Sequence, residues 1–155
     1  MDKTLSLQDQ FAPSLTCFGC GPSNPQGLQI KSYVQGDKVI AHFSPQSHHQ
    51  AYEGMVNGGI IGALLDCHMN WTATWHLMEK LGLEIPPCTV TARYGVVFEA
   101  PTPVDSELTL VAWVVDSSER RAEVRATLGV KDSMTATGEG TFVSVKPGHP
   151  AYHRW

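Results

Sequence analysis

The stretch NGGIIGALLDCHMNWTATWHLMEK, residues 57–80, decides the fold. It is the only long apolar run without proline, and its large apolar side chains cover every side of a helix. Asn57 is a favoured N-cap residue at the start, and Gly82 lies just beyond the charged end. A helix that is apolar nearly all round must be covered on most of its surface by the rest of the fold. We therefore predict one long, buried helix over this stretch.

One face of the predicted helix is small and polar. Steps of three, four and seven residues place five side chains in one line: Gly59, Gly62, Asp66, Asn70 and Ala73. Such a line serves either close packing, with Asp66 hydrogen-bonded to a neighbour, or a ligand slot with Asp66 at its middle. An unpaired buried carboxylate costs several kcal/mol, so a lone Asp in an apolar helix needs a reason. We favour the ligand slot.

Composition excludes several classes of protein. The chain has 155 residues, which is the size of one domain with a substantial core. A formal net charge of −4 argues against binding to nucleic acid. Residues 1–16 lack the pattern of a signal peptide, and no apolar run is long enough to span a membrane. We expect a cytoplasmic protein without nucleic-acid or membrane partners.

Alternating patterns predict six strands around the helix. Two precede it and four follow it, over residues 28–34, 38–43, 89–98, 107–115, 121–130 and 133–145. Short connectors favour antiparallel neighbours, and a flat sheet cannot cover a helix that is apolar all round. The fold class is therefore α+β, with a curled antiparallel sheet wrapped around one helix. The uncovered outer face of the sheet predicts a homodimer or a dimer of dimers.

The chain divides simply. Residues 1–16 form a loose lead-in, residues 17–146 a single domain, and residues 147–155 a tail. We expect no metal at Cys17-x-x-Cys20, because zinc needs four ligands and no second pair of this kind exists; a metal-bound Cys17/Cys20 site stays open as a minor alternative. The two thiols are interpreted as buried side chains that pin a tight loop. His48 and His49, in a polar loop before the helix, are solvated or serve as acid–base groups or ligands.

Three segments resemble the PaaI-like acyl-CoA thioesterases of the hotdog superfamily. They are GMVNGGIIGALLD at residues 54–66, TARYGVVFEAP at residues 91–101 and CFGCGPSNPQGL at residues 17–28. The first is similar to the family segment G-x-V-H-G-G-x-x-x-x-L-x-D/E. The resemblance spans roughly residues 17–145 and implies the hotdog fold, a helix wrapped by a curled antiparallel sheet. Asn57 stands where the family usually has His, and Asn cannot titrate near neutral pH.

What the resemblance implies is hydrolysis of an acyl-CoA thioester. The amide of Gly58 or Gly59 stabilises the oxyanion at the helix head, where Asn57 is the cap. Asp66 acts as general base or nucleophile, and Asn70 holds the water or the carboxylate. Coenzyme A enters only as part of the substrate, so no cofactor is expected.

We expect the phosphates of coenzyme A to contact basic side chains, among them Arg93, Arg121 and Arg125. His49 is predicted as a further substrate contact. A solvated strand face explains the same arginines equally well. Two other functions stay open: an acyl-CoA-binding module without hydrolysis, and a hydratase or dehydratase that pairs Asp66 with His48 or His49.

Overall fold

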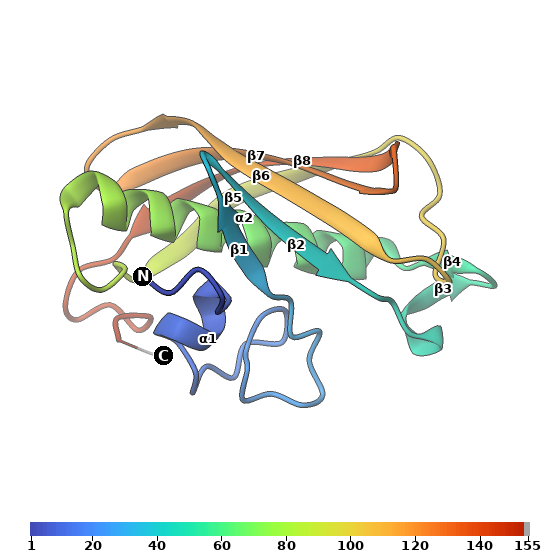
Figure 1. Cartoon of the computed structure of the whole chain (residues 1–155), viewed down its shortest axis with the longest axis horizontal. Helices are drawn as coiled ribbons and strands as arrows, with labels where there is room; N and C mark the ends of the chain where they lie inside the picture. The colour runs from blue at the N-terminus through green and yellow to red at the C-terminus, as the bar shows by residue number, and fades with distance from the viewer. Residues whose placement is uncertain (154–155) are drawn as a thin grey trace.

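One long helix forms the axis of the molecule (Figure 1). The computed structural model describes residues 1–153. Helix α2, Gly58–Leu81, begins where the Asn57 side chain accepts a hydrogen bond from the Gly59 amide. It ends at Gly82, whose φ of 64° lies in the left-handed region that glycine adopts without strain. The predicted helix is confirmed. No helix among the described residues is long and apolar enough to cross a membrane.

A six-stranded antiparallel sheet curls over α2 (Figure 1). Its order is β1-β2-β6-β7-β8-β5. The strands are β1 (Ser32–Gln35), β2 (Lys38–Phe43), β5 (Thr89–Phe98), β6 (Leu108–Ser117), β7 (Arg121–Val130) and β8 (Ser133–Ser144). The topology confirms the α+β hotdog fold that the alternating patterns and the resemblance predict.

The core lies between α2 and the inner face of the sheet. Every second residue of β7 is buried there, from Ala122 to Leu128. Leu65 and Met69 of α2 face β8, where a Cβ at Gly138 would lie 3.1 Å from the Met69 methyl carbon. Glycine at position 138 thus lets β8 come close to the helix.

The lead-in is not loose, which corrects the expectation for residues 1–16. It contains helix α1, Leu7–Phe11, whose N-cap Ser6 accepts a hydrogen bond from the Asp9 amide at 3.0 Å. Leu7 and Gln8 are buried. The polar loop before α2 holds a 3-10 turn, η1 (Ser47–His49), and a small hairpin of β3 (Gln50–Tyr52) and β4 (Met55–Val56). The predicted domain limits, residues 17 and 146, stay predictions.

A buried chain of hydrogen bonds ties this lead-in to α2. His68 Nε2 lies 3.0 Å from the Val39 carbonyl, so it carries the proton, and Nδ1 accepts from the Ser32 hydroxyl at 2.9 Å. Gln8 donates to the Ser32 hydroxyl at 3.0 Å and accepts from the Ser32 amide at 2.9 Å. Burial lowers the pKa of His68 to about 4, so the ring is neutral. Sequence reasoning assigned His68 no role.

Candidate active site

The line of small and polar residues on α2 faces the edge strand β5. The two elements run antiparallel: a Cβ at Gly58 would lie 3.3 Å from the Phe98 ring, and one at Gly62 would lie 3.2 Å from the Tyr94 hydroxyl. Further along, the Thr91 hydroxyl donates to Asp66. Gly62 of the line therefore packs closely against β5, whereas Asp66 and Asn70 line a pocket.

Asp66 lies half-buried in that pocket, which has a volume of about 230 Å³. Its Oδ1 accepts a hydrogen bond from Thr91 Oγ1 at 2.7 Å, and Oδ2 has no partner among residues 1–153. Burial raises the pKa of Asp66, the Thr91 hydrogen bond lowers it, and the nearby charge of Cys17 raises it. One carboxylate oxygen is thus left for a ligand or a water molecule.

Asn70 lines the same pocket one turn further along α2. Its Oδ1 accepts a short hydrogen bond from the Thr89 hydroxyl, which is in turn bonded to the Thr74 hydroxyl. The side-chain oxygen is therefore fixed, while the amide nitrogen has no partner among the described residues. That nitrogen supplies N–H donors beside Asp66.

At the helix head, Gly58 and not Gly59 offers the free amide. The Gly59 N–H donates to Asn57 Oδ1 at 2.8 Å, as an N-cap requires. No acceptor among residues 1–153 bonds to the Gly58 N–H, and Gly58 lines a second pocket of about 400 Å³. Eight residues, or about 12 Å of helix, separate Gly58 from Asp66. Within one chain the two groups do not come together.

His49 was predicted to contact substrate, but its side chain is buried and hydrogen-bonded within the loop before α2. Its ring is buried, Nδ1 accepts the Gln46 amide at 2.9 Å, and its carbonyl accepts the Asn57 amide at 2.8 Å. Burial and the adjacent His48 lower the pKa of His49. The side chain lines neither the Asp66 pocket nor the Gly58 pocket. It fixes the segment that enters α2.

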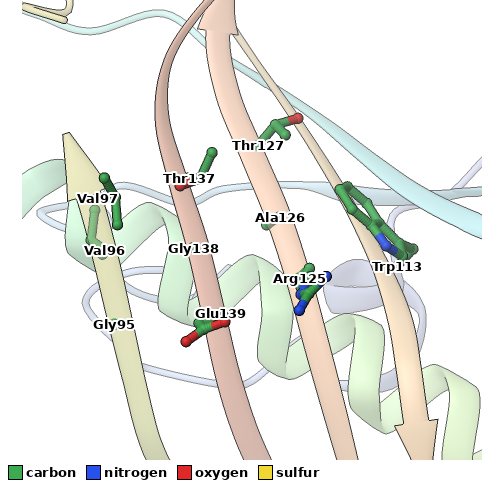
Figure 2. A pocket seen from close by; sticks show the side chains of 10 residues that line it. All are labelled: Gly95, Val96, Val97, Trp113, Arg125, Ala126, Thr127, Thr137, Gly138 and Glu139. Atoms are coloured by element: carbon green, nitrogen blue, oxygen red, sulfur yellow. The ribbon is translucent and has the colours of Figure 1, made fainter. Parts of the chain in front are cut away.

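The three predicted arginines lie on the opposite face of the sheet. Arg93 and Arg121 approach Glu123 at 3.9 and 3.6 Å. Arg125 lines a hollow of about 410 Å³ with Trp113, and Figure 2 shows α2 behind the sheet in this view. Within one chain the sheet separates all three arginines from Asp66.

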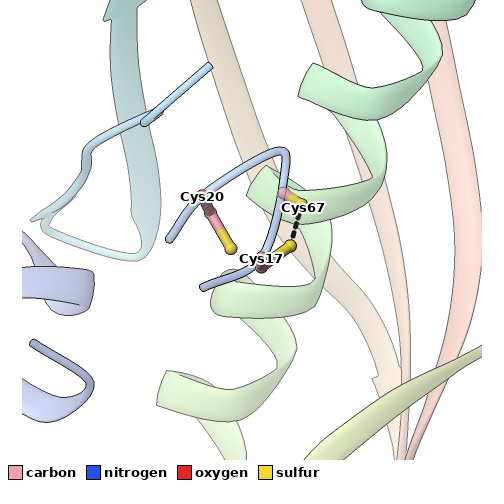
Figure 3. A group of neighbouring side chains, drawn as sticks. All are labelled: Cys17, Cys20 and Cys67. Atoms are coloured by element: carbon pink, nitrogen blue, oxygen red, sulfur yellow. Dashed lines mark hydrogen bonds between the residues drawn. The ribbon is translucent and has the colours of Figure 1, made fainter. Parts of the chain in front are cut away.

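Sequence reasoning missed a third cysteine beside the Cys17-x-x-Cys20 loop. Cys67 follows Asp66 on α2, and its Sγ lies 3.7 Å from that of Cys17 (Figure 3). All three thiols line the pocket that Asp66 occupies. The sequence shows that Cys67 is adjacent to Asp66. It does not show that the Cys17-x-x-Cys20 loop contacts Cys67.

The outer edge of β5 has no strand beside it among the described residues. This edge is ten residues long and carries large apolar side chains with exposed fractions of 45–56%: Tyr94, Val97 and Phe98. Long apolar edges invite pairing with another chain. The same strand, β5, also holds Asp66 in place through the Thr91 hydrogen bond.

The chain belongs to the thioesterase superfamily, whose family model matches residues 53–137. This match covers α2, β5, β6, β7 and the first part of β8, and α2 carries both Asp66 and Gly58. None of the curated proteins matches the chain.

Solved structures agree with the assignment. A thioesterase superfamily protein from Shewanella loihica PV-4 is 31% identical, with a TM-score of 0.66 over 81% of this chain and 98% of that one. The E. coli PaaI protein from the phenylacetic acid degradation operon is 13% identical, with a TM-score of 0.62 over 77% and 81%. Mouse thioesterase superfamily member 2 is 17% identical, with a TM-score of 0.59 over 74% and 81%. These two distant structures support the fold alone.

Proposed function

We propose that the protein hydrolyses acyl-CoA thioesters to a free acid and coenzyme A, with Asp66 as the general base. The observation that carries the proposal is the Asp66 carboxylate, which opens into a pocket with one oxygen bound by Thr91 and the other free. A raised pKa makes it a stronger base than an ordinary aspartate. Membership of the thioesterase superfamily supplies the reaction class.

In the proposed reaction, Asp66 takes a proton from a water molecule at its free oxygen. The resulting hydroxide attacks the thioester carbonyl, and the Gly58 N–H at the positive end of α2 stabilises the oxyanion. The carbon–sulfur bond then breaks, and the protonated Asp66 returns its proton to the departing thiolate. Asn70 orients the water through its free amide hydrogens.

The proposal requires two copies of the chain, because one carbonyl cannot reach both Gly58 and Asp66 of the same helix. Gly62 is the midpoint between them, and it packs on Tyr94 near the middle of β5. A twofold axis through the middle of an antiparallel β5–β5 pair would set Gly58 of one copy beside Asp66 of the other. The long apolar edge of β5 supports this pairing.

The sheet lies between the predicted arginines and Asp66 of the same chain. Arg93, Arg121 and Arg125 therefore stay predicted contacts for the coenzyme A phosphates only of a substrate bound at the site of another copy. A hydratase that uses His49 has little support, because the ring nitrogen Nδ1 is bonded to the Gln46 amide.

Release of free thiol from a graded series of acyl-CoA substrates tests the function. We expect turnover with at least one acyl class, and a loss of roughly 10²–10⁴-fold in Asp66→Asn. Asp132→Asn, an exposed aspartate in the β7–β8 turn, is the matched control and should keep full activity. Acyl-CoA binding without thiol release in the wild type would instead assign a binding module.

A further inference from the structure

The loop before β1 and helix α2 together form a cluster of three sulfur atoms. The Sγ atoms of Cys17, Cys20 and Cys67 all lie within 4.8 Å of one another. Figure 3 shows both loop cysteines on the turn that faces Cys67. All three are free thiols. We propose that this cluster binds one zinc ion through three thiolates, a site that neither the superfamily match nor the proposed hydrolysis requires.

The spacing of the sulfur atoms fits tetrahedral zinc. Zinc–sulfur bonds of about 2.3 Å in a tetrahedron place neighbouring sulfurs roughly 3.8 Å apart. The Cys17–Cys67 separation is 3.7 Å, and Cys20 is within 4.8 Å of both, so no sulfur–sulfur distance has to shorten by more than about 1 Å. All three cysteines line the pocket of about 230 Å³, which can supply solvent as the fourth ligand. Three protein ligands with one open position is an established zinc arrangement.

Donors around the cluster are arranged for thiolates. Trp71 Nε1 donates to Cys20 Sγ at 3.3 Å, and the backbone amides of Cys20 and Gly19 donate to Cys17. N–H groups directed at sulfur stabilise its anionic form and orient metal-bound thiolates. Gly19 is also required sterically, since a Cβ there would lie 2.4 Å from Cys67 Sγ. The loop approaches the helix as closely as its backbone allows.

Charge explains why a cation suits the cluster. The three groups are free thiols within 4.8 Å of one another, and three thiolates at that spacing would repel each other. A divalent ion removes the repulsion and releases the thiol protons, so binding should weaken as pH falls.

The metal would join the first part of the chain to the wall of the Asp66 pocket. Residues 17–30 have few regular elements, and their backbone is held by turns such as the Gly21 amide to the Cys17 carbonyl at 2.8 Å. A metal crosslink to α2 fixes this segment more firmly than three thiols in contact do. The expected role is to hold this loop against α2, with solvent as the fourth ligand, and the ion takes no part in the hydrolysis proposed above.

Metal content and cobalt spectroscopy test the proposal on the full-length chain. Protein purified under reducing conditions is expected to hold about one zinc per chain, because the three thiolates together bind a single ion. Replacement by cobalt(II) should give thiolate-to-cobalt charge-transfer absorption. Cys67→Ser and Cys17→Ser should lose the band and most of the metal. Cys88→Ser is the matched control, because Cys88 is a buried thiol outside the cluster whose Sγ accepts a hydrogen bond from the His153 amide. This variant should keep both the cobalt band and the metal.

Two further measurements separate this proposal from the catalytic one. Asp66→Asn should lose hydrolysis but keep the cobalt band, and chelation should lower the melting temperature of the wild type and of this variant alike. The wild type gives the decisive result even where a cysteine variant fails to fold. The proposal is overturned if the reduced wild type contains no zinc and gives no cobalt thiolate band.

Discussion

Asp66 and His68 are two polar residues on one apolar helix, two positions apart, and the fold treats them in opposite ways. His68 is fully buried, and both of its ring nitrogens are bonded, one to Ser32 and one to the Val39 carbonyl. Asp66 is half-buried beside a pocket, and one of its oxygens has no protein partner among residues 1–153. A polar side chain whose bonding capacity is complete holds the structure together. One whose capacity is incomplete, at a pocket, is a candidate for chemistry.

Removing the Gly58 N–H should give the largest loss of activity after that of Asp66→Asn. Proline is tolerated at the first position of a helix, and the extended Asn57 before it suits a following proline. We expect Gly58→Pro to keep the fold and lose about 10²–10³-fold in turnover, the typical cost of one oxyanion donor. Gly58→Ala is the control, since it adds a Cβ beside Phe98 but keeps the N–H.

The same variant shows whether the site is shared between two copies. A heterodimer of Gly58→Pro with Asp66→Asn contains one site in which both groups are intact. Co-expression of the two inactive chains should therefore restore roughly a quarter of wild-type activity, given random pairing in a twofold dimer. No restoration, with both chains folded and associated, would show that Gly58 and Asp66 do not act across an interface.

His68 tests the structural side of the comparison. His68→Leu leaves the Val39 carbonyl and the Ser32–Gln8 pair without their partner, which should cost about 2–4 kcal/mol in the free energy of unfolding. Activity per folded molecule should stay near the wild-type value, unlike that of Asp66→Asn. Urea unfolding measures the difference, and His42→Gln, at an exposed histidine on β2, is the control.

The pH dependence of this loss has a definite sign. Burial depresses the pKa of His68 from 6.5 to about 4 in the folded chain, so the unfolded chain binds the proton more readily. The wild type should therefore lose stability as pH falls from 6.5 towards 4, and His68→Leu should lack this part of the loss. An identical pH profile in the two proteins would contradict the buried neutral ring.

The elements of the fold could be predicted from the sequence because each has a period. The apolar helix and the alternation in β7 depend only on local geometry, and the antiparallel order follows from short connectors. The short helix α1 was missed because five residues give too little periodicity, and its burial depends on Gln8 meeting Ser32, 24 residues away. Such a pairing depends on the tertiary structure and cannot be predicted from local sequence.

The candidate site could be predicted only in part, for a similar reason. Asp66 stood out because an aspartate is costly in an apolar helix. Spacing on the helix also placed Asn70 beside it, as found in the pocket. No local pattern showed that Asn57 occupies the Gly59 amide, that Arg125 faces away from α2, or that Cys67 meets Cys17. Those relations depend on which face of each element the folded chain exposes.

The contribution of Asp66 to the free energy of unfolding should change with pH in the opposite direction to that of His68. Its folded pKa lies above the unfolded value, so the folded chain holds this proton more tightly. The free energy of unfolding should therefore fall as pH rises through the interval between the two pKa values. Asp66→Asn removes this term. The stability of the variant relative to the wild type should be greater at neutral pH than at a pH below the unfolded pKa, as measured by urea unfolding at both.

The smallest expected effect concerns Thr91, the one residue that completes part of the bonding capacity of Asp66. Its hydroxyl lowers the Asp66 pKa and so offsets some of the rise caused by burial. Thr91→Val removes the hydroxyl at nearly constant volume, so the pKa should rise and the acid limb of the pH–rate profile should move to higher pH. Thr91→Ser keeps the donor and should keep the profile. If the limb moves equally in both variants, the hydroxyl is not what tunes the carboxylate, and Asp66 depends on burial alone for its strength as a base.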